Sequence, residues 1–188
     1  MARSSARRDI GVAIGIPEPY TSELQGWRER LGDSNATQIP PHVTLLPPTA
    51  LRTDDLQAVE AHLLEVACRH EPFIMHLRGS GTFRPISPVV FVPLVQGISE
   101  CERIEAQVRS GPLQREVTFP YHPHVTVAHE VSEQQLDRAF EDLADYDARF
   151  RVWGFTMFEK GRDNVWRPQR DFPFDSPLPG PLPPAEPG

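Results

Sequence analysis

The sequence predicts an α+β fold: a bilobal, pseudo-twofold repeat in which two mostly antiparallel sheets, flanked by helices, surround a central cleft. One observation behind this prediction is that helical and strand-like hydrophobic periodicities alternate along the chain. The other is that the tetrapeptide Pro-His-Val-Thr occurs at 41–44 and again at 123–126, in the same place within two matching series of elements. A chance match of four residues does not predict matching surroundings, so we expect a duplicated unit.

The first half of the chain contains the first copy of the tetrapeptide. Ile10, Val12 and Ile14 alternate with small residues, as a strand with one buried face requires. Pro47 and Pro48 are expected to end the short strand that carries the motif, because proline donates no backbone hydrogen bond. The expected elements are a strand over 9–16, a helix from a cap at Thr21 to Gly32, a strand over 42–46, a helix capped by Thr53, and strands over 73–79 and 89–94.

The second half repeats this order: helix, motif strand, helix, strand, strand. Ser99 with Glu102, and Ser132 with Gln135, have the spacing of capping boxes at helix starts. The expected elements are a helix from Ser99, a strand over 124–129, a helix from Ser132, and strands over 150–158 and 165–167. The motif strands are therefore equivalent, and we expect them to meet at the cleft.

Composition sets limits on the protein class. We expect residues 1–174 to form one domain whose lobes share the cleft, and the proline-rich segment 175–188 to be a disordered tail. The apolar stretch near the N-terminus is too short and interrupted for a signal peptide or a membrane span, so no membrane partner is expected.

The two cysteines, Cys68 and Cys101, fall in predicted helices and are expected to be buried, reduced thiols of a cytoplasmic protein. The formal charge of −7 argues against a general nucleic-acid-coating protein, which leaves a nucleic-acid end or fragment as substrate.

The motif spacing predicts a catalytic arrangement. Alternate residues of a strand share a face, so His42 and Thr44 point one way and Val43 the other, and the second copy behaves alike. Near neutral pH one imidazole can accept a proton while a second donates one, which is what in-line substitution at phosphorus requires without a metal. The hydroxyls of Thr44 and Thr126 would hold the non-bridging phosphate oxygens.

Two alternatives compete with paired-histidine catalysis. His122 and His124 are spaced i, i+2 and could start a zinc site completed by His129 or His42. This alternative leaves the duplicated threonines unexplained, because the first copy has Pro40 in place of His122. The cleft could instead only bind a nucleotide phosphate, without turnover.

The two motifs and their placement resemble the 2H phosphoesterases, and specifically the 2'-5' RNA ligase and RNA 2',3'-cyclic phosphodiesterase family. His42-Val43-Thr44-Leu45 and His124-Val125-Thr126-Val127 both fit the His-x-Thr pattern that defines the family. The segment Gly81-Thr82-Phe83-Arg84-Pro85 is also similar to the stretch that precedes the mid-chain strand in that family. The resemblance spans roughly residues 9–170.

The resemblance implies the function and roles of the residues. It implies an enzyme that acts without a metal on 2',3'-cyclic phosphates at RNA ends or in small nucleotides, or on 2',5'-linkages. We also expect the protein to be a monomer without a cofactor. It also implies His42 as the proton donor, His124 as the proton acceptor, and Thr44 and Thr126 as phosphate-binding residues. Many relatives carry a basic or aromatic residue just before the first motif, where this chain has Gln38-Ile39-Pro40-Pro41. Arg84 could instead supply the charge, and Phe83 or Tyr121 could stack on a base.

Overall fold

The computed structural model describes residues 7–175, which form four α-helices, nine strands and three short 3₁₀ helices. The helices are α1 (Tyr20–Leu31), α2 (Leu56–Ala67), α3 (Ile98–Val108) and α4 (Glu133–Asp142). The strands are β1 (Arg7–Gly15), β2 (His42–Arg52), β3 (Phe73–Arg78), β4 (Gly81–Thr82), β5 (Val89–Gln96), β6 (His124–His129), β7 (Asp147–Val152), β8 (Gly154–Lys160) and β9 (Trp166–Pro173). The expected α+β fold and the repeated order of helix, motif strand and helix are confirmed.

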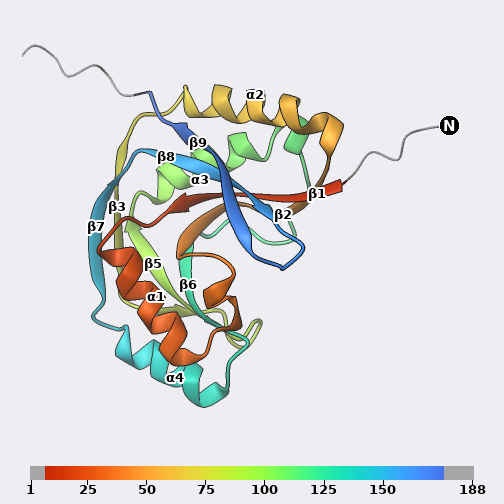
Figure 1. Cartoon of the computed structure of the whole chain (residues 1–188). Helices are drawn as coiled ribbons and strands as arrows, with labels where there is room; N and C mark the ends of the chain where they lie inside the picture. The colour runs from red at the N-terminus through yellow and green to blue at the C-terminus, as the bar shows by residue number, and fades with distance from the viewer. Residues whose placement is uncertain (1–6, 176–188) are drawn as a thin grey trace, which may run out of the picture.

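The two halves are joined through the motif strands. All strand pairs are antiparallel, and the strands follow one hydrogen-bonded path, β7-β3-β5-β6-β2-β1-β8-β9, with β4 beside β5. Strands β2 and β6, which carry the motifs, are neighbours at the centre of this path (Figure 1). The repeat therefore places its two equivalent strands side by side.

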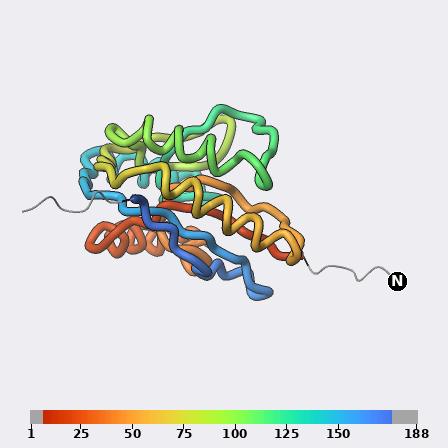
Figure 2. Tube along the Cα trace, turned by 90° about the horizontal axis from the view of Figure 1, so that it is seen from above, coloured from red at the N-terminus to blue at the C-terminus, as the bar shows by residue number. Residues whose placement is uncertain are grey.

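The helices pack in pairs at opposite ends of the molecule. In Figure 1, α1 lies against α4 at the bottom of the view and α2 lies beside α3 at the top, in agreement with the contacts between these helices. Figure 2, seen from above, shows α2 running between α3 and strand β9. The apolar faces of all four helices contribute to one hydrophobic core, which also contains the inward faces of the strands. No helix within residues 7–175 is long and apolar enough to cross a membrane.

The motif strand β2 is longer than the sequence predicts. It continues through Pro47 and Pro48 to Arg52 instead of ending at Leu46. The register with β1 shifts between the pairs Ile10–Thr49 and Val12–Leu46, so the two prolines fall in a bulge. A bulge tolerates the missing donor of proline, and so the strand resumes beyond it.

The prediction of one strand over 150–158 is wrong, because this segment belongs to two strands at different places in the sheet. Strand β7 ends at Val152 and pairs with β3, whereas β8 begins at Gly154 and pairs with β1. Gly154, at the start of β8, lets β9 approach closely, since a Cβ there would lie only 2.4 Å from the carbonyl oxygen of Phe172. Strand β9 is also longer than the expected 165–167, and it takes up prolines because it is an edge strand.

The predictions for helix caps and for the two cysteines are confirmed only in part. Gln135 donates its backbone N–H to the Ser132 hydroxyl at 3.3 Å, which confirms that cap, but helix α3 begins after Gly97 without a side-chain cap and α1 begins after Pro19 rather than Thr21. Cys101 is buried as expected, whereas Cys68 at the end of α2 is exposed, and both are free thiols. The tail expected over 175–188 lies, apart from Asp175, outside the described residues.

Candidate functional site

The two motifs form one cluster on one face of the sheet. Val43 on β2 is paired with Val125 on β6, and both side chains are completely buried. In an antiparallel pair the residues flanking this position lie opposite one another, so His42 lies across from Thr126 and Thr44 across from His124. Burying each valine stabilises the fold by about 1.5–3 kcal/mol and fixes which side of the strand faces the core. All four polar side chains are thus displayed together, each partly exposed on the face opposite the valines.

The two histidine rings are held in the same way. The Nδ1–H of His42 donates to the carbonyl of Pro40 at 2.8 Å, and the Nδ1–H of His124 donates to the carbonyl of His122 at 2.6 Å. A carbonyl can only accept, so Nδ1 carries the hydrogen in both rings. Each neutral imidazole therefore keeps Nε2 free to accept a proton.

Burial shifts both imidazoles toward their neutral forms. Desolvation lowers the pKa of His42 from 6.5 to about 4, opposed by the Pro40 hydrogen bond and aided by the nearby charges of Arg28 and His124. Desolvation also lowers the pKa of His124, opposed by its bond to His122 and aided by the charge of that histidine. The charge of His124 lies near enough to His42 to help lower the pKa of the His42 imidazole.

The threonine hydroxyls are available to a ligand. Within residues 7–175, neither Thr44 nor Thr126 uses its hydroxyl in a hydrogen bond to another group, and both side chains are only partly buried. A hydroxyl can donate to a phosphate oxygen and rotates to suit it. Each motif thus presents one imidazole nitrogen and one hydroxyl.

Phe83 and Tyr121, the two alternatives for stacking on a base, both lie close to the motifs but in different surroundings. The Phe83 ring packs on Phe91 at 4.4 Å and meets the His124 ring edge-on at 5.0 Å, so it forms part of the apolar wall that desolvates this imidazole. Tyr121 packs against the core and donates its hydroxyl to the Thr44 carbonyl at 2.9 Å, and burial raises its pKa. Tyr121 thus ties the segment before β6 to β2.

Arg84, expected to supply positive charge, is bound to carboxylates. Its Nη1 lies 2.9 Å from Glu133 Oε2 and 2.8 Å from Asp137 Oδ1, both on helix α4. These hydrogen bonds raise the pKa of the Arg84 guanidinium. In this arrangement Arg84 ties the loop before β5 to α4, and its charge is already compensated.

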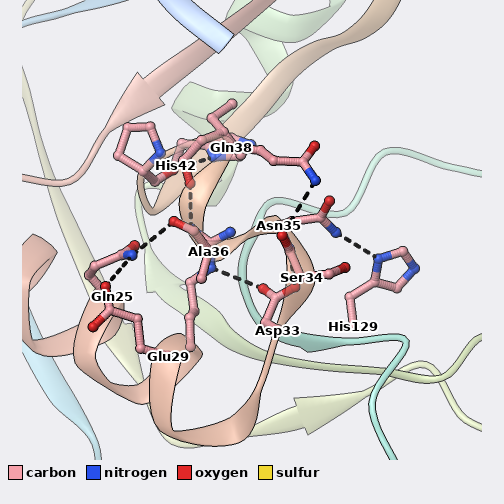
Figure 3. A network of polar contacts seen from close by, with 12 residues as sticks. Gln25, Glu29, Asp33, Ser34, Asn35, Ala36, Gln38, His42 and His129 are labelled. Carbon is pink, nitrogen blue, oxygen red and sulfur yellow. Dashed lines mark hydrogen bonds and ion pairs between the residues drawn. The ribbon is translucent and has the colours of Figure 1, made fainter. Parts of the chain in front are cut away.

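The loop that leads to His42 is held by helix α1. Arg28, almost fully buried, lies 3.0 Å from Asp33 in an ion pair and donates to the Ile39 carbonyl at 2.6 Å. Gln25 donates to the Ala36 carbonyl at 2.8 Å. Figure 3 shows how Gln25 reaches from the helix to this loop. The carbonyl that orients His42 belongs to Pro40, directly after the Ile39 carbonyl that Arg28 holds, so this network positions the imidazole.

The same loop contacts the second motif strand. The side-chain N–H of Asn35 donates to Nδ1 of His129 at 3.3 Å (Figure 3). His129 is the last residue of β6, and it follows the register shift that separates the pairs Phe91–Thr126 and Val90–Ala128. The loop before β2 therefore connects the two halves beside the motifs.

An apolar pocket of about 170 Å³ opens beside the first motif. His42 and Thr44 line one part of it, and none of its lining residues comes from the second motif. Trp166 and Phe158 are its aromatic members, and Trp166 donates its backbone N–H to the Gln38 carbonyl at 2.8 Å. The remaining walls and floor consist of Gly11, Val12, Ala13, Ile39, Leu46, Pro47 and Pro48.

The zinc site considered from the sequence is not assembled. In the described part of the chain, no three His, Cys, Asp or Glu side chains come together to hold a metal ion. His122 and His124 have ring centres 5.8 Å apart, but His129 is turned to Asn35 and His42 to Pro40. The donor set that this alternative needs is therefore missing from residues 7–175.

Sequence reasoning missed Arg28 and Trp166. A signal for Arg28 existed, because it lies among the apolar residues Leu24, Trp27 and Leu31 on the buried face of its helix. A charge in such a stripe indicates a buried pair. Trp166 gave no comparable signal, since only the tertiary fold brings β9 beside the loop before β2.

Comparison with known proteins finds a matching family and similar proteins. A sequence model of the 2'-5' RNA ligase superfamily matches residues 16–164. A protein of Halalkalibacterium halodurans named "Putative phosphoesterase BH1439" is 30% identical over 128 residues, which cover 68% of this chain and 74% of that protein. A Bacillus cytotoxicus protein named "Putative phosphoesterase Bcer98_0945" is 25% identical over 126 residues, which cover 67% of this chain and 72% of that protein.

Solved structures share the fold. The structure of E. coli LigT complexed with NADP+ aligns with a TM-score of 0.65 at 18% identity, covering 90% of this chain and 99% of LigT. LigT complexed with 3'-AMP aligns with a TM-score of 0.59 over the same shares. The TT0787 protein of Thermus thermophilus aligns with a TM-score of 0.59 at 20% identity, covering 88% and 97% of the two chains.

Proposed function

Because the chain belongs to the 2'-5' RNA ligase superfamily, we propose that it is a metal-independent phosphoesterase that opens 2',3'-cyclic phosphates at RNA ends or in small nucleotides. The resemblance to the 2H phosphoesterases seen in the two motifs is confirmed by this match. The observation that carries the proposal is the Val43–Val125 pair, which sets two histidines and two threonines on one face across two neighbouring strands. Action as a cytoplasmic monomer belongs to the same proposal.

The proposed reaction uses both imidazoles in one step. One neutral histidine takes a proton from water through its free Nε2, while the water oxygen forms a bond to phosphorus. The bond from phosphorus to one ribose oxygen breaks, and the other histidine, protonated, gives its proton to that oxygen. Water is consumed and a phosphate monoester is produced, so atoms and protons balance without another reactant. If the 5'-hydroxyl of a second RNA end attacks in place of water, the same step forms a 2',5'-phosphodiester and frees the 3'-hydroxyl, which is a ligation. In the reverse of that step, cleavage of a 2',5'-linkage, the two histidines exchange roles.

The surroundings of the motifs suit this reaction. Thr44 and Thr126 offer hydroxyls to the two non-bridging oxygens, where negative charge is held in the transition state. Arg84 is committed to Glu133 and Asp137, so the charge of the phosphate is met by the protonated histidine and the hydroxyls. LigT structures with 3'-AMP and NADP+ support nucleotides as the ligand class.

A panel of substrates tests the proposal. The purified protein is incubated with 2',3'-cyclic nucleotides, a 2',5'-linked dinucleotide and a cyclic-phosphate-ended oligonucleotide, with and without a chelator, and each product is identified. We expect monoester products, with 2'-phosphate among them, at rates that the chelator does not change. Binding of the nucleotides without any product would establish a binding module instead. Turnover that needs added metal would overturn the two-histidine mechanism.

The pKa shifts predict the pH dependence of kcat/KM. Activity needs one protonated and one neutral imidazole, and burial places the pKa values of both His42 and His124 below 6.5. As the pH rises above both values, the protonated fraction of the acid falls about tenfold per unit. We therefore expect kcat/KM to be highest on the acidic side of pH 6.5 and to decline steadily from pH 7 to 9. A rate constant that rises or stays level over this range would contradict the assignment.

A further inference from the structure

The pocket beside the first motif has the character of a site for a flat, uncharged ring. Of the described residues that line it, His42 alone has a side chain that can carry charge, and the only other side chains with polar atoms are the Thr44 hydroxyl and the Trp166 indole. Its floor is open because strand β1 supplies Gly11 and Ala13 there. A Cβ on Gly11 would already stand 3.4 Å from the Trp166 ring and from the Leu46 carbonyl oxygen.

The pocket is also continuous with the proposed phosphate site. His42 and Thr44 belong to both the pocket and the phosphate site. One ligand can therefore place its phosphate at the motifs and a group joined to that phosphate in the pocket. The backbone bond from Trp166 to Gln38 ties the aromatic wall to the loop that positions His42. The wall and the imidazole are therefore fixed relative to one another before a ligand arrives.

From these observations we infer that the pocket between Trp166 and the first motif receives the nucleobase of the substrate, by stacking and apolar contact, with little discrimination among bases. This inference rests on the proposed function and adds the part of the substrate that is recognised. Stacking on an aromatic ring accepts every base, because each has a π-face. Strong discrimination needs hydrogen-bonding groups aimed at the edge of the base, and the side chains of the pocket walls supply almost none.

The pocket also orders the roles of the two histidines. A base in it would place the ribose on the side of His42, which fits the proton-donor role that the family resemblance implies for His42. The attacking water then lies on the side of His124, which takes its proton. His42 is neutral at pH 7 in the free protein, and the negative phosphate that arrives with the nucleotide raises its pKa toward the protonated form.

Kinetics with a matched pair of substrates test the pocket. The kcat/KM of the four 2',3'-cyclic nucleotides is compared with that of glycerol 1,2-cyclic phosphate, which has the reacting group but no base. We expect the four nucleotides to lie within about tenfold of one another and each to exceed the base-free substrate by about 5- to 150-fold, the range of one stacked base. In Trp166→Ala that advantage should largely disappear.

Two further variants make the comparison specific. Trp153→Ala removes an indole that is 58% exposed and lies outside the pocket lining, and it should keep the advantage of the wild-type protein. Gly11→Ala adds one methyl to the pocket floor without removing a contact, and it should reduce the advantage even if Trp166→Ala does not fold.

The outcomes separate this inference from the proposed function. Equal use of nucleotides and glycerol 1,2-cyclic phosphate, or an unchanged advantage in folded Trp166→Ala, would overturn the base pocket and leave the phosphoesterase intact. No turnover of any cyclic phosphate would overturn the proposed function. In that case calorimetric titration with adenosine 2'-monophosphate still tests the pocket: weaker binding by Trp166→Ala than by Trp153→Ala supports it, and equal binding contradicts it.

Discussion

Replacing either motif histidine should lower the turnover of 2',3'-cyclic AMP by about 10²–10⁴-fold, the usual contribution of a general acid or base. His42→Ala removes the motif imidazole of β2 that exchanges a proton with the ribose oxygen or water, and His124→Ala removes the motif imidazole of β6. Both rings are only partly buried, and the strands are anchored by Val43 and Val125 on the opposite face. The loss should therefore appear in kcat, with the fold retained.

A third histidine provides the matched control. His76 on β3 pairs with Asp147 and lies outside both motifs, so His76→Ala should keep near-wild-type turnover. Circular dichroism and urea unfolding would establish that all three variants are folded. If folded His42→Ala or His124→Ala retained more than about a tenth of the wild-type turnover, paired acid–base catalysis would be wrong.

The Arg28–Asp33 pair should dominate the stability of the region before β2. Arg28→Met leaves the Asp33 carboxylate buried without its partner, and removing one member of a buried pair typically costs about 3–5 kcal/mol. Such a loss is a large part of the roughly 5–15 kcal/mol that stabilises a domain. We expect a matching fall in the free energy of unfolding measured in urea. In the molecules still folded, the pKa of His42 should rise, because the charge of Arg28 helps to lower it.

An exposed ion pair serves as the control for this prediction. Arg138 pairs with Asp142 one turn away on the surface of α4, with a side chain that is 60% exposed. Arg138→Met should change the free energy of unfolding by no more than about 0.5 kcal/mol. Equal effects of Arg28→Met and Arg138→Met would show that the buried pair does not hold the loop.

Much of the fold follows from local sequence patterns. Alternation at Ile10, Val12 and Ile14 predicts the first strand, and the cap at Ser132 predicts the start of α4, because both depend on neighbouring residues alone. The facing of the motifs follows from the period of two in a strand, and the complete burial of Val43 and Val125 confirms it.

The remaining features depend on contacts between distant segments. In the sequence, Pro47 and Pro48 predict the end of the motif strand. The strand continues beyond them because its pairing with β1 contains a bulge at this point. The compensation of Arg84 by Glu133 and Asp137 requires α4 to lie against the loop before β5, which no local pattern states. The pocket at Trp166 likewise exists only because β9 returns beside the loop before His42.

The most direct test of the paired-histidine proposal is a ³¹P NMR time course with 2',3'-cyclic AMP. The wild-type protein is compared with the double variant His42→Ala/His124→Ala, both in the presence of a chelator at pH 6.5. We predict that the wild-type protein converts the cyclic phosphate signal into that of a monoester, 2'-AMP, while the double variant leaves it unchanged. A folded wild-type protein that leaves the cyclic phosphate intact, or a double variant that converts it equally fast, would contradict the account.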